Sequence, residues 1–205
     1  MARPREFHTD TAVREALFVF WRKGYASTTM DDLERATGLG RMSLYNAFGD
    51  KEDLFQAALE RYLDATRRLY AKHLRGGGIT DIERLIDTYV HPAPLGEAGR
   101  WGCAMLGAIS AADGVSPRAR GAIENFRRFS VRKIKAELAA ARECGDIAAG
   151  VNLHDAADFI VTALWGAKAA IRHARSPAAA APVGRMLGRF LRSLRNDSPI
   201  KESRS

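Results

Sequence analysis

Apolar residues recur every three or four positions along almost the whole chain, and this spacing restricts the possible folds more than any other feature. Examples are Phe55, Leu59 and Tyr62 in one segment and Leu187 and Leu191 in another. That period is typical of helices with an apolar face, whereas a half-buried strand needs alternating apolar and polar residues, which no long stretch contains. The sequence therefore predicts an all-α fold of about nine helices and no sheet.

Short polar signals mark where several of these helices begin. Thr29 with Asp32 resembles a capping box, in which each side chain bonds the backbone N–H of the other residue. Asp50 precedes a long apolar stripe and is suited to cap it. Ser116-Pro117 combines a cap with a proline that fits the first helical turn. Each signal predicts a helix that starts at the next residue.

The composition of the 205 residues excludes several classes of protein. With 46% hydrophobic residues the chain is too apolar to be disordered, yet no apolar run reaches the ~18–20 residues that a membrane span needs. The first residues lack the apolar core of a secretory signal. Two cysteines, Cys103 and Cys144, make no disulfide scaffold. We therefore expect a cytoplasmic protein that has no metal site, no cofactor and no contact with a membrane.

A helix, a glycine turn and a second short helix predict a helix-turn-helix at about residues 29–48. The second helix of such a motif enters the major groove of DNA, where each base pair presents a distinct pattern of donors and acceptors. Leu44 and Phe48 face the core together, which leaves the other side chains of that helix for DNA. Lys51 lies in the next helix's first turn, where a cation opposes the helix dipole, and a bound phosphate would account for it.

This region resembles the DNA-binding region of the tetracycline-repressor (TetR/AcrR) regulators. The resemblance covers residues 3–63 and rests on Gly-Tyr at 24–25, Thr-Thr at 28–29 and the run LYNAFGDKEDL that begins at Leu44. It implies an all-helical homodimer that binds a palindromic operator in double-stranded DNA. It also implies release of the operator when a small-molecule effector enters the C-terminal domain.

The same resemblance implies roles for single residues. Thr29 and Tyr45 match phosphate contacts, and Lys51 matches a lysine that contacts the DNA backbone. Four further residues match positions that read bases or nearby phosphates, namely Arg41, Met42, Ser43 and Asn46. Gly40 departs from the family pattern, because a capping Ser or Thr is common there, and Met42 replaces a residue that is usually small.

The net charge of +8 suggests an anionic partner, but the excess of positive charge lies outside the helix-turn-helix. Residues 1–54 hold eight Lys or Arg and nine Asp or Glu, whereas residues 55–205 hold 24 and 15. Contacts with DNA must therefore come from particular residues, with the acidic side chains near them held away from the binding surface. Those acidic residues are Asp31, Asp32 and Glu34.

We expect a DNA-binding domain at 6–66, a ligand-binding and dimerisation domain at 67–196 and a flexible tail at 197–205. The helix expected from Leu153 to Ala174 is apolar almost all round, which predicts burial against its own core on one side and a second subunit on the other. The alternative is a central core helix of a monomer. The residues assigned to the dimer interface are Ala163, Leu164, Gly166, Ala167, Ala170, Met186, Leu187, Phe190 and Leu191.

Aromatic and polar residues of the C-terminal half suggest a pocket for a small, partly apolar effector, although ordinary core packing accounts for each of them singly. The candidates are Tyr62, Tyr70, Trp101, Cys103, Met105, Phe126, Phe129 and Trp165. Lys133 joins them because it falls within the apolar arc of its helix. There it either snorkels to water or meets an anionic ligand.

Two other classes of function stay open on the sequence alone. One is an all-helical enzyme with a nucleophile such as Cys103, although the chain contains no P-loop, HExxH or G-x-S-x-G motif. The other is an adaptor that binds proteins through its helical surface. The segment from Arg41 to Lys51 favours the DNA-binding regulator, because neither alternative needs it. The run Arg3-Pro4-Arg5 is either an arm for the minor groove or a solvated tail.

Overall fold

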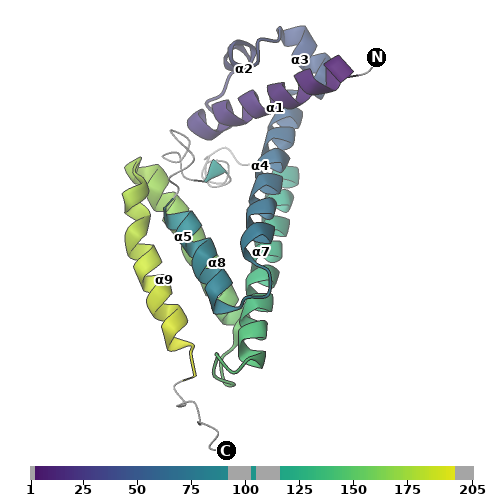
Figure 1. Cartoon of the computed structure of the whole chain (residues 1–205). Helices are drawn as coiled ribbons and strands as arrows, with labels where there is room; N and C mark the ends of the chain where they lie inside the picture. The colour runs from purple at the N-terminus through teal and green to yellow at the C-terminus, as the bar shows by residue number, and fades with distance from the viewer. Residues whose placement is uncertain (1–2, 92–102, 105–115, 197–205) are drawn as a thin grey trace, which may run out of the picture.

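The computed structural model describes residues 3–91, 103–104 and 116–196, with side chains from Thr9 onward. These residues form eight α-helices, one 3₁₀ helix and no strand, so the predicted all-α class is confirmed (Figure 1). Apolar residues such as Trp101, Leu106 and Ile109 predict a further helix near residues 100–112. Nearly all of that segment lies outside the described residues, as does the tail expected at 197–205. The elements are α1 (Arg3–Lys23), α2 (Met30–Thr37), α3 (Arg41–Phe48), α4 (Lys51–His73), α5 (Ile79–Val90), α7 (Pro117–Glu143), α8 (Leu153–Ala174), η2 (Pro177–Ala180) and α9 (Ala181–Ser193).

Three helix starts confirm the capping signals at Thr29, Asp50 and Ser116. A capping box expected from Thr80 and Glu83 is absent, because α5 begins at Ile79 after Gly78. The Thr29 hydroxyl accepts a hydrogen bond from the N–H of Asp32 at 3.2 Å, and the Asp32 carboxylate accepts one from the N–H of Thr29 at 3.1 Å. Asp50 caps α4, and Ser116 caps α7. The backbone is already helical at Arg3, so the start of the described chain is the first turn of α1 and not an extended arm.

The first three helices pack around the start of α4. Phe20 of α1 meets Phe55 of α4 edge to face, with ring centroids 5.1 Å apart, and the Tyr25 ring lies 4.8 Å from that of Phe55. Leu33 of α2 and Leu44 of α3 are buried in the same core. Because α2 and α3 each bury only one leucine fully, much of their outer surface stays in solvent.

α4 is one uninterrupted helix that leaves the N-terminal helices and continues alongside α7 (Figure 1). A glycine-rich loop after α4 is fastened to α7, because the Glu137 carboxylate accepts hydrogen bonds from the N–H groups of Gly76 and Gly78, each at 2.9 Å. Asp81 accepts another from the N–H of Gly77 at 2.9 Å. These two carboxylates hold the connection between α4 and α5 against α7.

α8 lies between α7 and α9 and supplies much of the C-terminal core. Its fully buried side chains include Ile160, Leu164, Ala167 and Ile171. They recur at three- and four-residue intervals, so one side of α8 is filled by packing within the chain. None of the helices in the described ranges combines the length and apolar character that crossing a membrane requires.

Candidate DNA-binding surface and effector region

α2 and α3 form the helix-turn-helix that the sequence predicts. α2 ends at Gly38, whose φ of 71° lies in the left-handed region that glycine adopts without strain. Gly40 then precedes α3 without a side-chain hydrogen bond, as its missing hydroxyl requires. α3 lies at the opposite end of the molecule from the C-terminal end of α9 (Figure 1).

The predicted DNA contacts of α3 share its exposed surface. Leu44 is 1% exposed and anchors the helix, whereas Met42 is 71% exposed and Tyr45 is 42% exposed. The other predicted contacts of this helix, all exposed, are Arg41, Ser43 and Asn46. The surface therefore presents a guanidinium, a thioether, a hydroxyl, a phenol and an amide, none of which the core needs.

Arg41 is held against α2 in this structure. Its Nε donates a hydrogen bond to Glu34 at 2.8 Å, and a terminal nitrogen pairs with Asp31. The hydrogen bond to Glu34 raises the pKa of Arg41 above its ordinary value. The expectation that Asp31 and Glu34 are held away from the predicted DNA-binding surface is wrong, because both pair with Arg41. The turn at Gly38 folds α3 back against α2, so that Asp31 and Glu34 of α2 come within reach of the long Arg41 side chain.

The predicted phosphate contacts outside α3 already have partners within the chain. Thr29 is exposed and caps α2. Lys51 is partly buried, and its Nζ lies 4.5 Å from the centroid of the Tyr25 ring. Burial lowers the pKa of Lys51. Burial and a hydrogen bond with Glu52 raise the pKa of Tyr25 to about 12. The cation–π contact gives this first-turn lysine a partner that its position in the sequence does not reveal.

Five of the predicted effector-pocket residues come together in the C-terminal half. The Tyr62 hydroxyl donates to Sγ of Cys103 at 3.4 Å. The Tyr70 ring centroid lies 6.0 Å from that of Phe126 and 5.9 Å from that of Phe129. Burial raises the pKa of both Tyr62 and Tyr70, so their hydroxyls stay protonated at neutral pH.

The other predicted pocket residues are placed differently. Trp165 packs against the same core, and its buried Nε1 has no hydrogen-bond partner in the described chain. Lys133 is exposed on α7, because its long side chain leaves the apolar arc and reaches water, so it does not line the interior as expected. Trp101 and Met105 lie outside the described residues.

Two residues that the sequence analysis missed belong to this region. Tyr89 of α5 meets Tyr70 edge to face with ring centroids 6.2 Å apart, and Nζ of Lys168 lies 4.9 Å from the Tyr89 ring centroid. Burial lowers the pKa of Lys168. The sequence contained a signal for Lys168, which lies four residues after Leu164 and three before Ile171. Residues at these spacings share one face of a helix, and both of these apolar neighbours are buried.

Family models match two parts of the chain. Bacterial regulatory proteins of the tetR family match residues 13–58, and the tetracyclin repressor-like C-terminal domain matches residues 78–187, more than half of the chain. The chain belongs to the TetR family.

Curated relatives match over shorter stretches. The HTH-type transcriptional repressor ComR of Escherichia coli K12 is 45% identical over 71 residues, which are 35% of this chain and 32% of ComR. The HTH-type transcriptional regulator YezE of Bacillus subtilis 168 is 36% identical over 78 residues, 38% of this chain and 40% of YezE. The matches therefore span well under two thirds of the length of these relatives.

Solved TetR structures match along nearly the whole chain. A regulator from Chloroflexus aurantiacus J-10-FL has a TM-score of 0.81 at 22% identity, covers 94% of this chain and is itself covered to 98%, which shows the shared fold. A cysteine mutant of the regulator CifR, in complex with 26-base-pair operator DNA, has a TM-score of 0.72 at 28% identity and coverages of 90% and 95%. These relatives are transcriptional regulators and not enzymes, so the enzyme alternative has no support among them.

The residues expected at a TetR dimer interface fall into two groups. Four are buried in the chain's own core and offer no surface to a partner, which corrects their assignment: Leu164, Ala167, Leu187 and Leu191. They pack α8 and α9 against the rest of the domain. Five stay at least partly exposed: Ala163, Gly166, Ala170, Met186 and Phe190. Phe159, which the sequence analysis did not assign, is 50% exposed, and its ring centroid lies 4.6 Å from that of Phe190.

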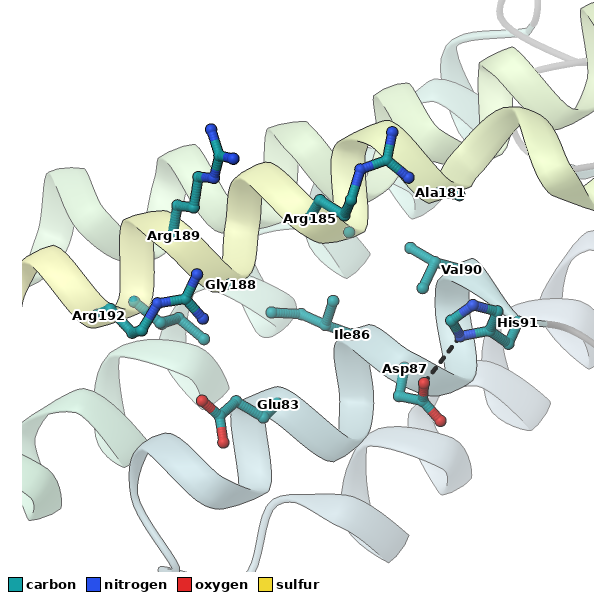
Figure 2. Close-up of a pocket in the computed structure, with 12 residues that line it drawn as sticks. Glu83, Ile86, Asp87, Val90, His91, Ala181, Arg185, Gly188, Arg189 and Arg192 are labelled. Carbon is teal, nitrogen blue, oxygen red and sulfur yellow. Dashed lines mark hydrogen bonds and ion pairs between the residues drawn. The ribbon is translucent and has the colours of Figure 1, made fainter.

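A groove of about 540 Å³ lies between α5 and α9 of this TetR protein (Figure 2). One side carries the exposed arginines Arg185, Arg189 and Arg192 of α9, and the other carries Glu83 and Asp87 of α5. None of the predicted effector-pocket residues that the structure describes lines this groove.

Proposed function

We propose that this TetR-family protein is a repressor that binds a palindromic operator as a homodimer and releases it when a small-molecule effector binds the C-terminal half. The observation that carries the proposal is the surface of α3, where one leucine holds the helix in the core and its polar side chains are exposed. A helix presented in this way fits the major groove of B-DNA. ComR is named a repressor, and the structure of a CifR cysteine mutant contains operator DNA. Both support the same mode of action.

In this proposal the residues of the helix-turn-helix divide between bases and phosphates. Arg41 is suited to a guanine edge, which accepts two hydrogen bonds from a guanidinium. Met42 contacts a thymine methyl group, and Ser43 and Asn46 bond to base edges or to nearby phosphates. The DNA backbone is contacted by Thr29, Tyr45 and Lys51, which set the register on the duplex without reading sequence.

The second subunit docks on the side of α8 and α9 that faces away from the core. Phe159 and Met186 are 50% and 57% exposed there. Small residues of α8 let a partner helix approach closely, namely Ala163, Gly166 and Ala170. Two subunits joined in this way carry two α3 helices to the two half-sites of a palindrome.

The domains divide within α4, with the DNA-binding domain at 6–66, the effector and dimerisation domain at 67–196 and a flexible tail at 197–205. Because α4 has no break at this boundary and packs on α7, a displacement of α4 by an effector also moves α1, α2 and α3. Operator binding places the protein in the cytoplasm, where bacterial DNA lies.

Tyr45→Ala and Arg41→Ala separate phosphate contact from base contact. Tyr45→Ala is expected to weaken binding to all duplexes about equally, because it removes a contact that reads no sequence. Arg41→Ala is expected to reduce discrimination at one base pair by roughly tenfold. Both effects are measured by fluorescence anisotropy on the DNA upstream of the protein's own gene and on single-base variants of it, at moderate salt.

Arg132→Ala is the matched control for Arg41→Ala, because it removes an exposed arginine of α7, a helix that packs mainly on α4, α5 and α8. It is expected to bind every duplex like the wild type. Wild-type behaviour of both test variants would contradict the residue roles. The regulator itself is contradicted when no duplex binds better than random DNA.

A further inference from the structure

Lys168 lies partly buried in the C-terminal half, where no carboxylate of the described residues pairs with it. Its contact is with the ring of Tyr89, 4.9 Å from Nζ to the centroid. A cation–π contact replaces only part of the hydration that a buried ammonium loses, and burial accordingly lowers the pKa of Lys168. The charged Lys168 side chain therefore lowers the stability of the protein without ligand.

The groups near Lys168 are aromatic rings and neutral hydrogen-bond donors. Tyr89 contacts Tyr70, which is fully buried. The side chains of Ser130 and Tyr89 lie near the Tyr70 hydroxyl and partly offset the effect of burial on its pKa, but neither forms a hydrogen bond of good geometry with it. Tyr62 and Cys103 form a second polar contact in the same region. Burial raises the pKa of all three tyrosines, so none of them supplies a negative charge.

We propose that Lys168 binds the carboxylate of the effector, which is a small organic acid with an apolar body. The acid would give the ammonium the counter-ion that it lacks and the Tyr70 hydroxyl an acceptor, while its body lies against Phe126 and Phe129. This inference rests on the proposed function and adds to it the chemical class of the effector.

The groove between α5 and α9 is another position in the C-terminal half where an anion could bind (Figure 2). Its three arginines are exposed and hydrated, so an ion pair there gains little. Glu83 and Asp87 also face the groove and repel an anion. The interior lysine is the more selective site, and the groove becomes an outcome of the test.

Thermal unfolding of the protein without ligand tests whether Lys168 destabilises the fold. Lys168→Met replaces the ammonium with an apolar side chain of similar length and is expected to raise the Tm of the free protein by about 2–4 °C. Lys133→Met on the exposed surface of α7 is the matched control and is expected to leave Tm unchanged. A lower Tm for Lys168→Met would show that the ammonium stabilises the free fold, and would overturn the proposal.

Binding is measured by calorimetry with three acid–amide pairs, benzoate and benzamide, 1-naphthoate and 1-naphthamide, octanoate and octanamide. At least one acid is expected to bind the wild type about tenfold more tightly than its amide. Lys168→Met is expected to lose this preference, and Lys168→Arg to keep part of it. The proposal is overturned when no acid binds, when the amides bind as tightly as the acids, or when the preference survives in Lys168→Met and disappears in Arg189→Gln.

Operator binding separates this inference from the proposed function. Lys168→Met is expected to bind the operator with wild-type affinity, since α8 lies in the other half of the molecule from α3 (Figure 1). When the wild type binds an operator and only uncharged or basic compounds release it, the effector class is wrong and the repressor stands. When the wild type binds no operator, the proposed function itself fails.

Discussion

At the scale of single residues, the predicted DNA contact Arg41 forms ion pairs within the protein itself. Its ion pairs with Glu34 and Asp31 are exposed to solvent, where such pairs contribute little to stability. A guanine edge offers two acceptors in a geometry that matches the guanidinium. We interpret the two carboxylates as the partners of Arg41 in the absence of DNA. Because these exposed ion pairs are weak, Arg41 can leave them for DNA at a small cost in free energy.

Glu34→Gln is expected to tighten operator binding roughly two- to fivefold, because it releases Arg41 and removes a negative charge beside the DNA phosphates. Asp64→Asn is the matched control, since Asp64 is an exposed carboxylate of α4 that pairs with Arg67. Anisotropy titrations at equal salt compare the two variants. In the Arg41→Ala background the gain from Glu34→Gln should shrink. An equal gain in both backgrounds would exclude competition for Arg41.

At the scale of elements, the two ends of α3 tolerate side chains differently. Gly40 has a φ of −67°, and a Cβ built there meets no atom within 4 Å. Gly49 has a φ of 91°, and its Cβ would lie 2.4 Å from Oδ2 of Asp53, the residue that completes the cap of α4. A serine therefore fits at the start of α3 and strains the backbone at its end.

Gly40→Ser is expected to raise the free energy of unfolding by about 0.5 kcal/mol, through a hydroxyl cap and a less flexible unfolded chain. Gly49→Ser is expected to lower it by about 2 kcal/mol, because a non-glycine residue is strained at this backbone conformation. Urea unfolding followed by circular dichroism measures both. Should Gly40→Ser destabilise the protein, the missing cap is not what limits α3.

At the scale of the whole molecule, the exposed side of α8 and α9 is unusually apolar for a surface in water. Phe159 and Met186 are large apolar side chains and among the most exposed ones in the described chain. Phe159 lies against Phe190, so the apolar surface is continuous between the two helices. Such patches are typical of surfaces that bind another protein, and a second copy of this chain is the partner we propose.

Met186→Glu is expected to convert the proposed dimer to monomers in sedimentation experiments, because a carboxylate would have to lose its water at the interface. Operator affinity is expected to fall at least about tenfold, since each monomer then holds one half-site. Ala136→Glu places the same charge on an exposed position of α7 and is expected to stay dimeric. Retention of the dimer in both Met186→Glu and Phe159→Lys would move the interface to another surface.

The sequence by itself determined the all-α class, the helix-turn-helix, the capping box of α2 and the Asp50 cap of α4. These features depend on residues three or four positions apart, such as Thr29 and Asp32, so the local spacing contains the whole interaction. The exposure of the α3 contacts followed from the same spacing, because Leu44 takes the core side of that helix.

Only the tertiary structure decided which apolar residues of α8 and α9 fill the core and which lysine enters the interior. Periodicity marks a face of a helix as apolar without indicating what covers that face. Leu164 and Phe159 are both apolar residues of α8 in the sequence, but in the structure Leu164 is buried and Phe159 is exposed. Lys168 of α8 contacts Tyr89 of α5, a helix that is far from α8 in the sequence. Lys133 is instead exposed to water. Burial and charge pairing are properties of several elements together, and no single helix encodes them.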